Sequence, residues 1–283
     1  MKRLKIIDKH YVNRVFRSVR VFAASSLGIQ KSVITALLFR ELNSRFGRYR
    51  LGYGWAILEP LLFIGTLTLI RISLGSGDVG GVAYPLFFAS GILPYLFFQN
   101  VVNVSLSAIE ANSGVLNYQR VKAFDVIAAR WLLEIIIFIF TALLIFTGFK
   151  IAGFEVNLPA IGYSVLGTML LAFFAFGIGM LFAVIAVVWG EIKKIVPVIM
   201  RPLFFVSGIF FTVDSLPSEI KDLALLNPLI HSLQLIRYGL LSGYEGRSWD
   251  LGYLATWSFA TMLLGLSLLR IFREKVLASG TLR

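Results

Sequence analysis

Five ionisable residues lie inside or near the ends of long apolar runs, where a charge is costly unless it has a partner or a task. They are Glu59, Arg71, Arg130, Glu134 and Arg201. One interpretation gives them a direct role in moving a polar substrate across a membrane. The other is structural: the first three are near run ends, where long side chains can snorkel to the surface. Arg130 and Glu134 are four residues apart on one helix face and can pair with each other.

The second apolar run combines aromatic rings with amides. Tyr95 and Phe98 share a run with Gln99 and Asn103, and amide side chains should not face lipid. The rings can belong to the interfacial and lipid-facing aromatics of membrane proteins. Alternatively, they form a pore wall and stack on the C–H faces of sugars, which the two amides favour. The candidate channel residues are therefore Trp55, Glu59, Arg71, Tyr95, Phe98, Gln99, Asn103 and Arg201.

The sequence contains no catalytic constellation. It has no cysteine, and its two histidines, His10 and His231, fall in different compartments under the topology derived below, so they cannot form a metal-binding pair. The phosphate-binding pattern G-x-x-x-x-G-K-[ST] does not occur either. We therefore expect no catalytic residues, metal or cofactor in this chain, and a protein that is not itself an enzyme.

Two short polar connectors have the composition of docking segments. The first, at 110–124 (EANSGVLNYQRVKAF), places polar side chains around Val115 and Leu116, a pattern that an ordinary loop would not need. The second, at 189–194 (WGEIKK), is a tight charged turn. Because a short helix can dock in a cleft of a partner protein, we expect contacts through Glu110, Asn112, Asn117, Tyr118, Arg120, Glu191 and Lys193.

The segment 28–50 has the periodicity of a basic amphipathic helix that lies flat on a membrane surface. Arg40 and Arg48 lie on its polar face, available for lipid headgroups or a partner protein. A turn rich in glycine and aromatic residues, which includes Trp55, leads from this helix into the first apolar run. The apolar stripe, which would face lipid or the bundle, comprises Ile34, Leu38, Leu42, Phe46 and Tyr49.

These residues must be positioned by an all-α integral membrane protein. The 283 residues are 58% hydrophobic and only 15% charged, whereas roughly a quarter of residues are charged in soluble domains. We predict six transmembrane helices, near 55–74, 82–106, 126–149, 160–188, 195–213 and 251–272. Two half-helices, near 218–226 and 229–241, are too short to span and favour a re-entrant or interfacial pair. The expected domains are a basic arm (1–27), the amphipathic helix (28–50), the membrane domain (51–272) and a tail (273–283).

The distribution of charge predicts the orientation. The net charge is +12, and 12 of the 27 Lys and Arg lie in residues 1–50, against two acids there. With six spans, 21 of the 27 basic residues fall on the side of the two termini, so we predict that both termini are cytoplasmic. Basic residues crowded beside the first span indicate anionic lipid rather than nucleic acid.

Three segments carry a resemblance to a known family: RELNSRFGRYRLGYGWAILEP at 40–60, AIEANSGVLNYQRVKAFDVIAAR at 108–130 and NPLIHSLQLIRYGLLSGY at 227–244. With this layout the sequence resembles the permease subunit of ABC-2 type exporters, and most closely the capsular polysaccharide export permeases of Gram-negative bacteria (the KpsM-like group). The resemblance runs from about residue 30 to the end, and the first segment is specific for the family.

The resemblance implies a type V exporter fold and a homodimer of permeases in the inner membrane, above two copies of a separate ATPase that holds ATP and Mg. A lipid-linked polysaccharide would be threaded outward through the channel. The first connector would be the main coupling helix, 191–194 a second contact and helix 28–50 a brace against the ATPase. The half-helix pair would cap the outer end, near a periplasmic adaptor. Prolines expected at the positions of Arg120 and Ala123 are absent, which favours a connector that runs on as a smoother helix.

Two alternatives stay open. Within the same class, the substrate is O-antigen, teichoic acid or another lipid-linked glycan. In a different class, the chain is a stand-alone membrane enzyme or flippase for lipid-linked sugars, which would turn over in liposomes without a partner.

Overall fold

A computed structural model of the protein describes residues 28–45, 52–75, 78–156, 158 and 160–278. The described residues are helical apart from turns, loops and one isolated bridge between Val79 and Val82. This confirms the all-α prediction for that part of the chain. The predicted arm at 1–27 and the last five residues of the predicted first helix, 46–50, lie outside the described residues; Phe46, Arg48 and Tyr49 are among them.

Residues 28–45 form the first helix. The long helices that follow are α2 (Gly52–Ser73), α3 (Tyr84–Leu106), α6 (Ala123–Ile151), α7 (Ile161–Val188), α8 (Ile192–Val206) and α11 (Leu251–Ile271). The short ones are α4 (Ala108–Ala111), α5 (Ser113–Leu116), η1 (Val213–Ser215), α9 (Ser218–Ala224), α10 (Pro228–Leu240) and α12 (Arg273–Ala278). Within the described residues, four helices, α3, α6, α7 and α11, are long and apolar enough to cross a membrane.

The fifth predicted span is shorter than expected, which corrects its predicted end near residue 213. Helix α8 has 15 residues and ends at Val206, so at about 1.5 Å per residue it is shorter than a hydrocarbon layer of roughly 30 Å. The chain turns at Gly208, whose φ of +74° is a conformation that glycine adopts readily. The sequence after α8 therefore folds back toward α10 instead of extending the span.

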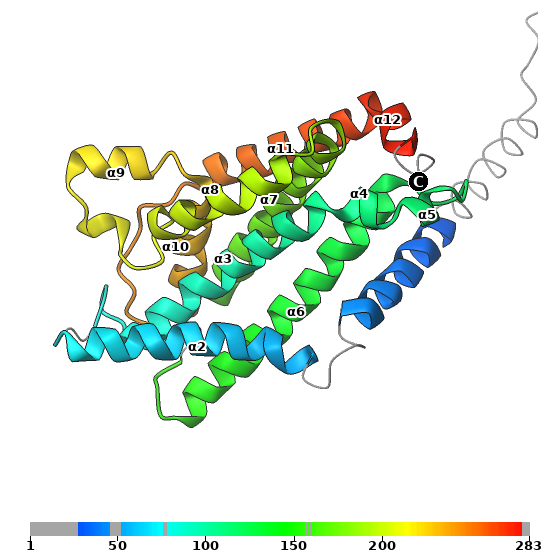
Figure 1. Ribbon diagram of the computed structural model, residues 1–283. Coiled ribbons are helices and arrows are strands. Elements are labelled where there is room, and N and C mark those ends of the chain that lie inside the picture. Colours follow the sequence, from blue (N-terminus) through cyan, green and yellow to red (C-terminus); the bar gives the residue numbers. More distant parts are fainter. Residues whose placement is uncertain (1–27, 46–51, 76–77, 157, 159, 279–283) are drawn as a thin grey trace, which may run out of the picture.

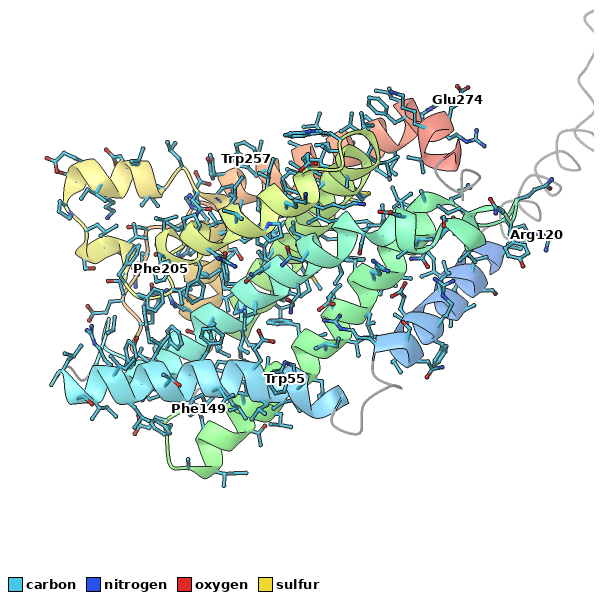
Figure 2. All side chains as sticks on the ribbon, in the orientation of Figure 1. Trp55, Arg120, Phe149, Phe205, Trp257 and Glu274 are labelled. Atoms are coloured by element: carbon cyan, nitrogen blue, oxygen red, sulfur yellow. The ribbon has the colours of Figure 1, made fainter. Side chains whose placement is uncertain are left out.

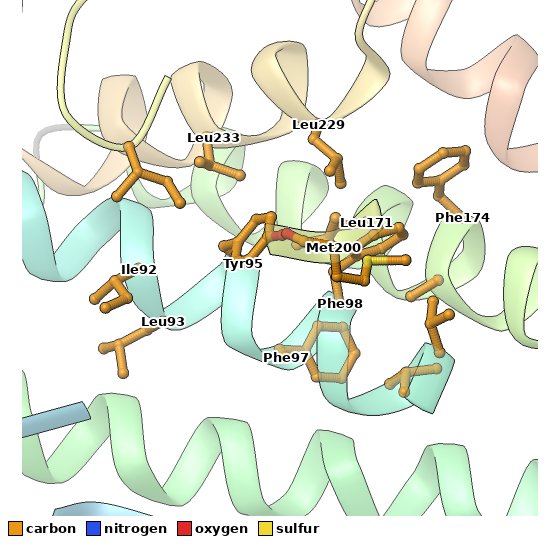
Figure 3. Packing of buried hydrophobic residues seen from close by; sticks show 14 of the residues in the cluster. Ile92, Leu93, Tyr95, Phe97, Phe98, Leu171, Phe174, Met200, Leu229 and Leu233 are labelled. Atoms are coloured by element: carbon orange, nitrogen blue, oxygen red, sulfur yellow. The ribbon is translucent and has the colours of Figure 1, made fainter. Parts of the chain in front are cut away.

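Helix α3 lies in the centre of the bundle, with α2 and α6 on one side and α7, α10 and α11 on the other (Figure 1). The most apolar stretch of α3 is 78% buried, whereas that of the more hydrophobic α6 is 22% buried, so helix contacts rather than hydropathy give α3 its central position. The main buried cluster is built around it, with Ile92, Tyr95 and Phe98 packed against Leu171, Met200 and Leu229 (Figure 3).

Helices α7 and α11 pack closely because glycines lie at their contact. A Cβ atom at Gly177 would lie 2.6 Å from the backbone nitrogen of Met262, closer than Cβ atoms come in real structures. At Gly265 it would lie 2.8 Å from the Cβ of Met180. Small residues let helix backbones approach in this way in membrane proteins.

The predicted half-helices are α9 and α10, and they break where expected. The Asn227 side chain accepts a hydrogen bond from the backbone nitrogen of Leu229 at 3.1 Å, and Pro228 occupies the first helical position. The two differ in burial: α10 packs in the bundle against α7 and α3, whereas α9 has no buried residue.

Asp214 connects the segment around α9 to its neighbours through two side-chain contacts. Its carboxylate accepts hydrogen bonds from Lys221 Nζ at 2.9 Å and from Ser248. Burial acts to raise the pKa of Asp214, but the bonds from Ser248 and Lys221 outweigh it and hold the pKa below its usual 3.8. This ion pair and hydrogen bond join η1 to α9 and to the loop before α11.

Both ends of the described chain lie at one end of the bundle. The first helix, α4, α5 and α12 gather there, and α9 lies at the opposite end (Figure 1). Leu37 of the first helix and Val276 of α12 belong to one buried cluster with Leu116 and Ile127. This end, which we call the connector end, carries the residues predicted to dock a partner.

Candidate functional site

A group of charged and amide side chains, the polar cluster, fastens the first helix to the bundle at the connector end. Its members are Glu41, Arg45, Asn112, Arg130 and Glu134. Glu41 Oε1 accepts hydrogen bonds from Arg130 Nε at 3.1 Å and from Asn112 Nδ2 at 3.2 Å, and Arg45 pairs with Glu134. The cluster thus links the first helix, the first connector and α6.

The partners of Arg130 and Glu134 differ from the prediction that the two pair with each other along α6. Each binds a residue of the first helix, which lies alongside α6. Arg130 Nη1 also donates to the carbonyl of Val104 at 2.6 Å and to Ser107 Oγ at 3.1 Å. The sequence pattern of α6 shows only that Arg130 and Glu134 could pair within that helix. The opposite charges that they bind come from the first helix, which this pattern does not reveal.

The buried face of the first helix differs in detail from the predicted stripe. Leu37, which the stripe left out, is the most buried residue, and Ile34 and Leu38 are half-buried beside it. Glu41 lies on this same face, and Gln30 Nε2 donates to Asp125 at 2.9 Å. The helix therefore meets the bundle through apolar and polar contacts together. Arg40 is 46% exposed and lies 3.7 Å from Glu41.

The first connector is not the smooth helix that the missing prolines suggested. It consists of two four-residue helices, α4 and α5, separated at Asn112. The Asn112 side chain donates to the carbonyl of Ala108 at 2.8 Å, a local bond of the kind that competes with helix continuation. Asn112 is 1% exposed. It binds the connector to the first helix, so the prediction that it faces a partner protein is wrong for this conformation.

The two connectors meet each other. Glu110 of α4 forms an ion pair with Lys193, in the first turn of α8. The sequence predicts that Glu110 and Lys193 contact a partner protein, but in this structure they pair with each other and are 41% and 34% exposed. Farther along, Asn117, Tyr118 and Arg120 are exposed, and Arg120 stands at the tip of the first connector (Figure 2). Glu191 is also exposed, beside Lys194 at 3.5 Å.

The predicted aromatic wall is instead an interior contact. Tyr95 is fully buried, and its hydroxyl donates to the carbonyl of Met200. Phe98 stacks on Phe174 with ring centroids 5.5 Å apart. Neither ring has a face free for a sugar, so the pore-wall interpretation is wrong for this conformation of the single chain. Gln99 and Asn103 are half-buried on the same helix.

The remaining channel candidates lie on α2 and α8. Trp55, Glu59 and Arg201 are exposed. The guanidinium of Arg71 lies over the Tyr84 ring, 5.3 Å from its centroid, a cation–π contact that accounts for a charge near a helix end. Helices α2 and α8 touch through Phe63 and Phe204, at 6.4 Å between ring centroids.

Arg237 is a charged residue that sequence reasoning missed. It lies on α10 and is fully buried. Its guanidinium donates to the carbonyls of Gly208 at 2.6 Å and Ile209 at 3.0 Å, and lies 3.8 Å from the centre of the Phe87 ring. It thereby binds α10 to α3 and to the turn after α8. The available signal was an arginine within an apolar half-helix, where it needs a polar partner.

The described residues hold no group of three or more His, Cys, Asp or Glu placed to bind a metal ion. His231 has a structural role: its Nδ1 accepts from the backbone nitrogen of Asp250 at 2.9 Å, and its Nε2 bonds with the carbonyl of Leu225 at 2.7 Å.

Comparison with known proteins gives a family match over most of the chain. The family described as "ABC-2 type transporter" matches residues 32–241. The polysialic acid transport protein KpsM of Escherichia coli is 36% identical over 257 residues, covering 91% of this chain and all of that protein. The capsule polysaccharide export inner-membrane protein CtrC of Neisseria meningitidis is 31% identical, covering 89% of this chain and 95% of its own. The O-antigen export system permease protein RfbA of Klebsiella pneumoniae is 20% identical, covering 72% and 78%.

Proposed function

The chain belongs to the ABC-2 type transporter family, and we propose that it is the permease subunit of an ATP-binding-cassette exporter of lipid-linked capsular polysaccharide. Relatives named for polysialic acid transport and capsule polysaccharide export align with about nine-tenths of the chain, which supports this substrate class. The structural observation that carries the proposal is the connector end, where the first helix and both connectors are joined to one another beside exposed Tyr118 and Arg120.

The contacts of α4 give a route by which a docked ATPase would move the bundle. Tyr118 and Arg120 are exposed for the partner. From α4, the ion pair of Glu110 with Lys193 leads to α8, and the bond from Asn112 to Glu41 leads to the first helix. A displacement of the first connector would therefore reach α8 and the first helix through one contact each.

We infer six spans, with α2 and α8 added to the four helices that length and composition support. Helix α8 is short, and α10, which packs against α3 and α7 as α8 does, would be a re-entrant segment. The connector end is cytoplasmic in this proposal, because it holds both ends of the described chain and the two connectors. The predicted topology assigns these parts to the side with 21 of the 27 basic residues. The end with α9 then faces the periplasm, available to an adaptor.

The proposed assembly is a homodimer with two ATPase subunits that hold ATP and Mg. Glu59 and Arg201 are exposed on neighbouring helices, and no ion pair joins either of them to another described residue. Because charges facing hydrocarbon are costly, we assign this face of α2 and α8 to a second copy or to an aqueous channel between two copies.

The test of the proposal combines export with ATPase binding. In a strain that lacks this reading frame, the wild-type chain should restore surface capsule, and the purified chain should bind the ATPase subunit. The variant Tyr118→Ala with Arg120→Ala should insert normally but lose export and ATPase binding. Arg247→Ala changes an exposed arginine in the loop that Ser248 joins to Asp214 near α9; it is the matched control and should behave as wild type. Unchanged export in the double variant would remove the coupling role.

The alternatives lead to different results. The similarity to an O-antigen export permease supports one alternative, export of O-antigen or another lipid-linked glycan. In that case the wild-type chain would restore that glycan rather than capsule. A stand-alone flippase or enzyme would move or modify lipid-linked sugars in liposomes that contain only this chain. Such partner-free turnover would overturn the assignment as a permease subunit.

A further inference from the structure

A long groove lies between α6 and α7, and none of its described lining residues belongs to α2 or α8. It has a volume of about 690 Å³, within the roughly 300–1,000 Å³ of pockets that bury whole small molecules. Helices α3 and α10 form its floor, through residues that include Leu93, Phe97 and Ile236. Figure 3 shows Leu93 and Phe97 on the side of α3 that faces α6. The ring centroids of Phe97 and Phe138, which lies on α6, are 5.1 Å apart.

Trp131 closes one end of the groove. Its indole nitrogen donates to the carbonyl of Ala172 on α7 at 2.9 Å, and its ring stacks on Phe176 with centroids 4.6 Å apart. These contacts pin α6 to α7 near the connector end. Beyond them, the two helices are separated by the groove along most of their length.

The walls of the groove suit hydrocarbon and little else. They are almost entirely aliphatic and aromatic. Four hydroxyl side chains line the groove. Ser90 of α3 donates to the carbonyl of Phe87 at 2.7 Å and Ser164 of α7 to that of Ile236 at 2.5 Å, and the other two are Thr147 and Thr168. A sugar or nucleotide would lose most of its hydrogen bonds to water here, because so few lining side chains are polar. An apolar chain would gain close contacts on several sides.

Among the described residues that line the groove, one is charged, and it lies at the end opposite Trp131. Lys150 lies in the last turn of α6 and is exposed. From Trp131 to Lys150 the helix rises by about 28 Å at 1.5 Å per residue, nearly the thickness of a hydrocarbon layer. A hydrocarbon layer holds two leaflets, so an acyl chain whose phosphate lies at Lys150 would fill about the half of the groove nearest to that cation.

We propose that this groove binds an acyl chain of an anionic membrane phospholipid, with its phosphate paired to Lys150. The inference requires only that α6 and α7 cross a bilayer, so it stands apart from the proposed export function. The lipid end of an exported polymer is a poorer match, because Lys150 lies at the end of α6 remote from α4 and α5 (Figure 1). A second copy packed face to face here would bring its own Lys150 to the same depth, and like charges would oppose the contact.

The experiment counts lipids that stay on the full-length chain. The protein is reconstituted in vesicles of equal parts phosphatidylglycerol and phosphatidylcholine, extracted with mild detergent and measured by native mass spectrometry. Wild type should keep one phospholipid per chain, mostly phosphatidylglycerol. Ala142→Phe and Thr168→Trp, which fill the groove from either wall, should lose it. Leu144→Trp, on α6 but outside the groove, is the matched control and should keep it.

Lys150→Ala separates the headgroup contact from the acyl-chain contact. It should retain a lipid but lower the preference for phosphatidylglycerol about fivefold, the effect of one basic residue near an anionic lipid. Because the chain has no cysteine, Leu143→Cys gives a clean test for a second copy. Disulfide-linked dimers through this position, or equal lipid retention by the filled variants and Leu144→Trp, would overturn the proposal. Retention without headgroup preference in wild type would overturn the role of Lys150.

Discussion

The pair between Glu41 and Arg130 should contribute measurably to stability, because it is largely shielded from water. The two side chains are 15% and 12% exposed, and Arg130 Nε lies 3.1 Å from Glu41 Oε1. An exposed ion pair contributes about 0–1 kcal/mol, whereas a hydrogen bond to a charged group contributes about 1.5–3 kcal/mol. Arg130 keeps its bonds to Val104 and Ser107 when Glu41 is removed. We therefore expect a coupling energy of about 2 kcal/mol, below the roughly 3–5 kcal/mol cost of breaking a fully buried pair.

A double-mutant cycle measures this energy. Glu41→Ala, Arg130→Ala and the double variant are unfolded in mixed micelles, and the coupling energy is the departure from additivity in the free energy of unfolding. Hydrogen exchange of residues 28–45 should rise in each single variant, because the first helix loses its link to α6. Arg40→Ala is the control: Arg40 is 3.7 Å from Glu41 but 46% exposed, so its effect should stay below about 0.5 kcal/mol.

A coupling energy below about 0.5 kcal/mol would refute the reasoning, since the pair would then behave as a solvated one. In that case the apolar contact of Leu37 would hold the first helix, and Leu37→Ala alone should cost about 2–5 kcal/mol. If Glu41→Ala and Leu37→Ala both left exchange in residues 28–45 unchanged, the helix would not be docked on α6 in solution.

Three further outcomes are expected. Gly177→Leu should destabilise the protein by about 1–3 kcal/mol through overpacking against α11. Gly162→Leu on the same helix should not, because an added Cβ there has no neighbour within 4 Å. Equal melting temperatures of the two variants would contradict this. Because the folded-state pKa of Asp214 is lowered, its stabilising pair with Lys221 is present above about pH 4 and is lost as the pH falls below it; the melting temperature of Asp214→Asn should therefore show a weaker fall than wild type in that range. Tyr95→Phe should lower the melting temperature modestly while export persists, and a loss of export at unchanged stability would restore a direct channel role for the ring.

The sequence located most helices well. Helix α7 begins and ends within a residue of the predicted span, and the half-helices break at Asn227 and Pro228 as expected. Hydropathy, proline and asparagine act within a few residues of themselves, so their consequences are visible in a linear pattern. The family resemblance, confirmed by the match over residues 32–241, rests on the same kind of local information.

Predictions about partners fared less well, since they depend on residues far apart in the chain. Asn112 was expected to face another protein but bonds to Glu41, 71 residues earlier. Tyr95 was expected at a pore but donates to Met200, 105 residues later. In both cases the sequence shows that a polar group needs a hydrogen-bond partner. Which residue supplies that partner depends on how the helices pack.

The sequence by itself determined that this is an all-helical membrane protein of an exporter family, where its helices lie and which residues must find polar partners. Only the tertiary structure decided that the first helix is fastened to α6 through Glu41 and Arg130, that α4 meets α8 through Glu110 and Lys193, and that Arg237 is enclosed by backbone carbonyls. The physical reason is that helix formation follows from local periodicity, whereas a buried charge is stabilised by whichever acceptors the packing of distant segments brings to it.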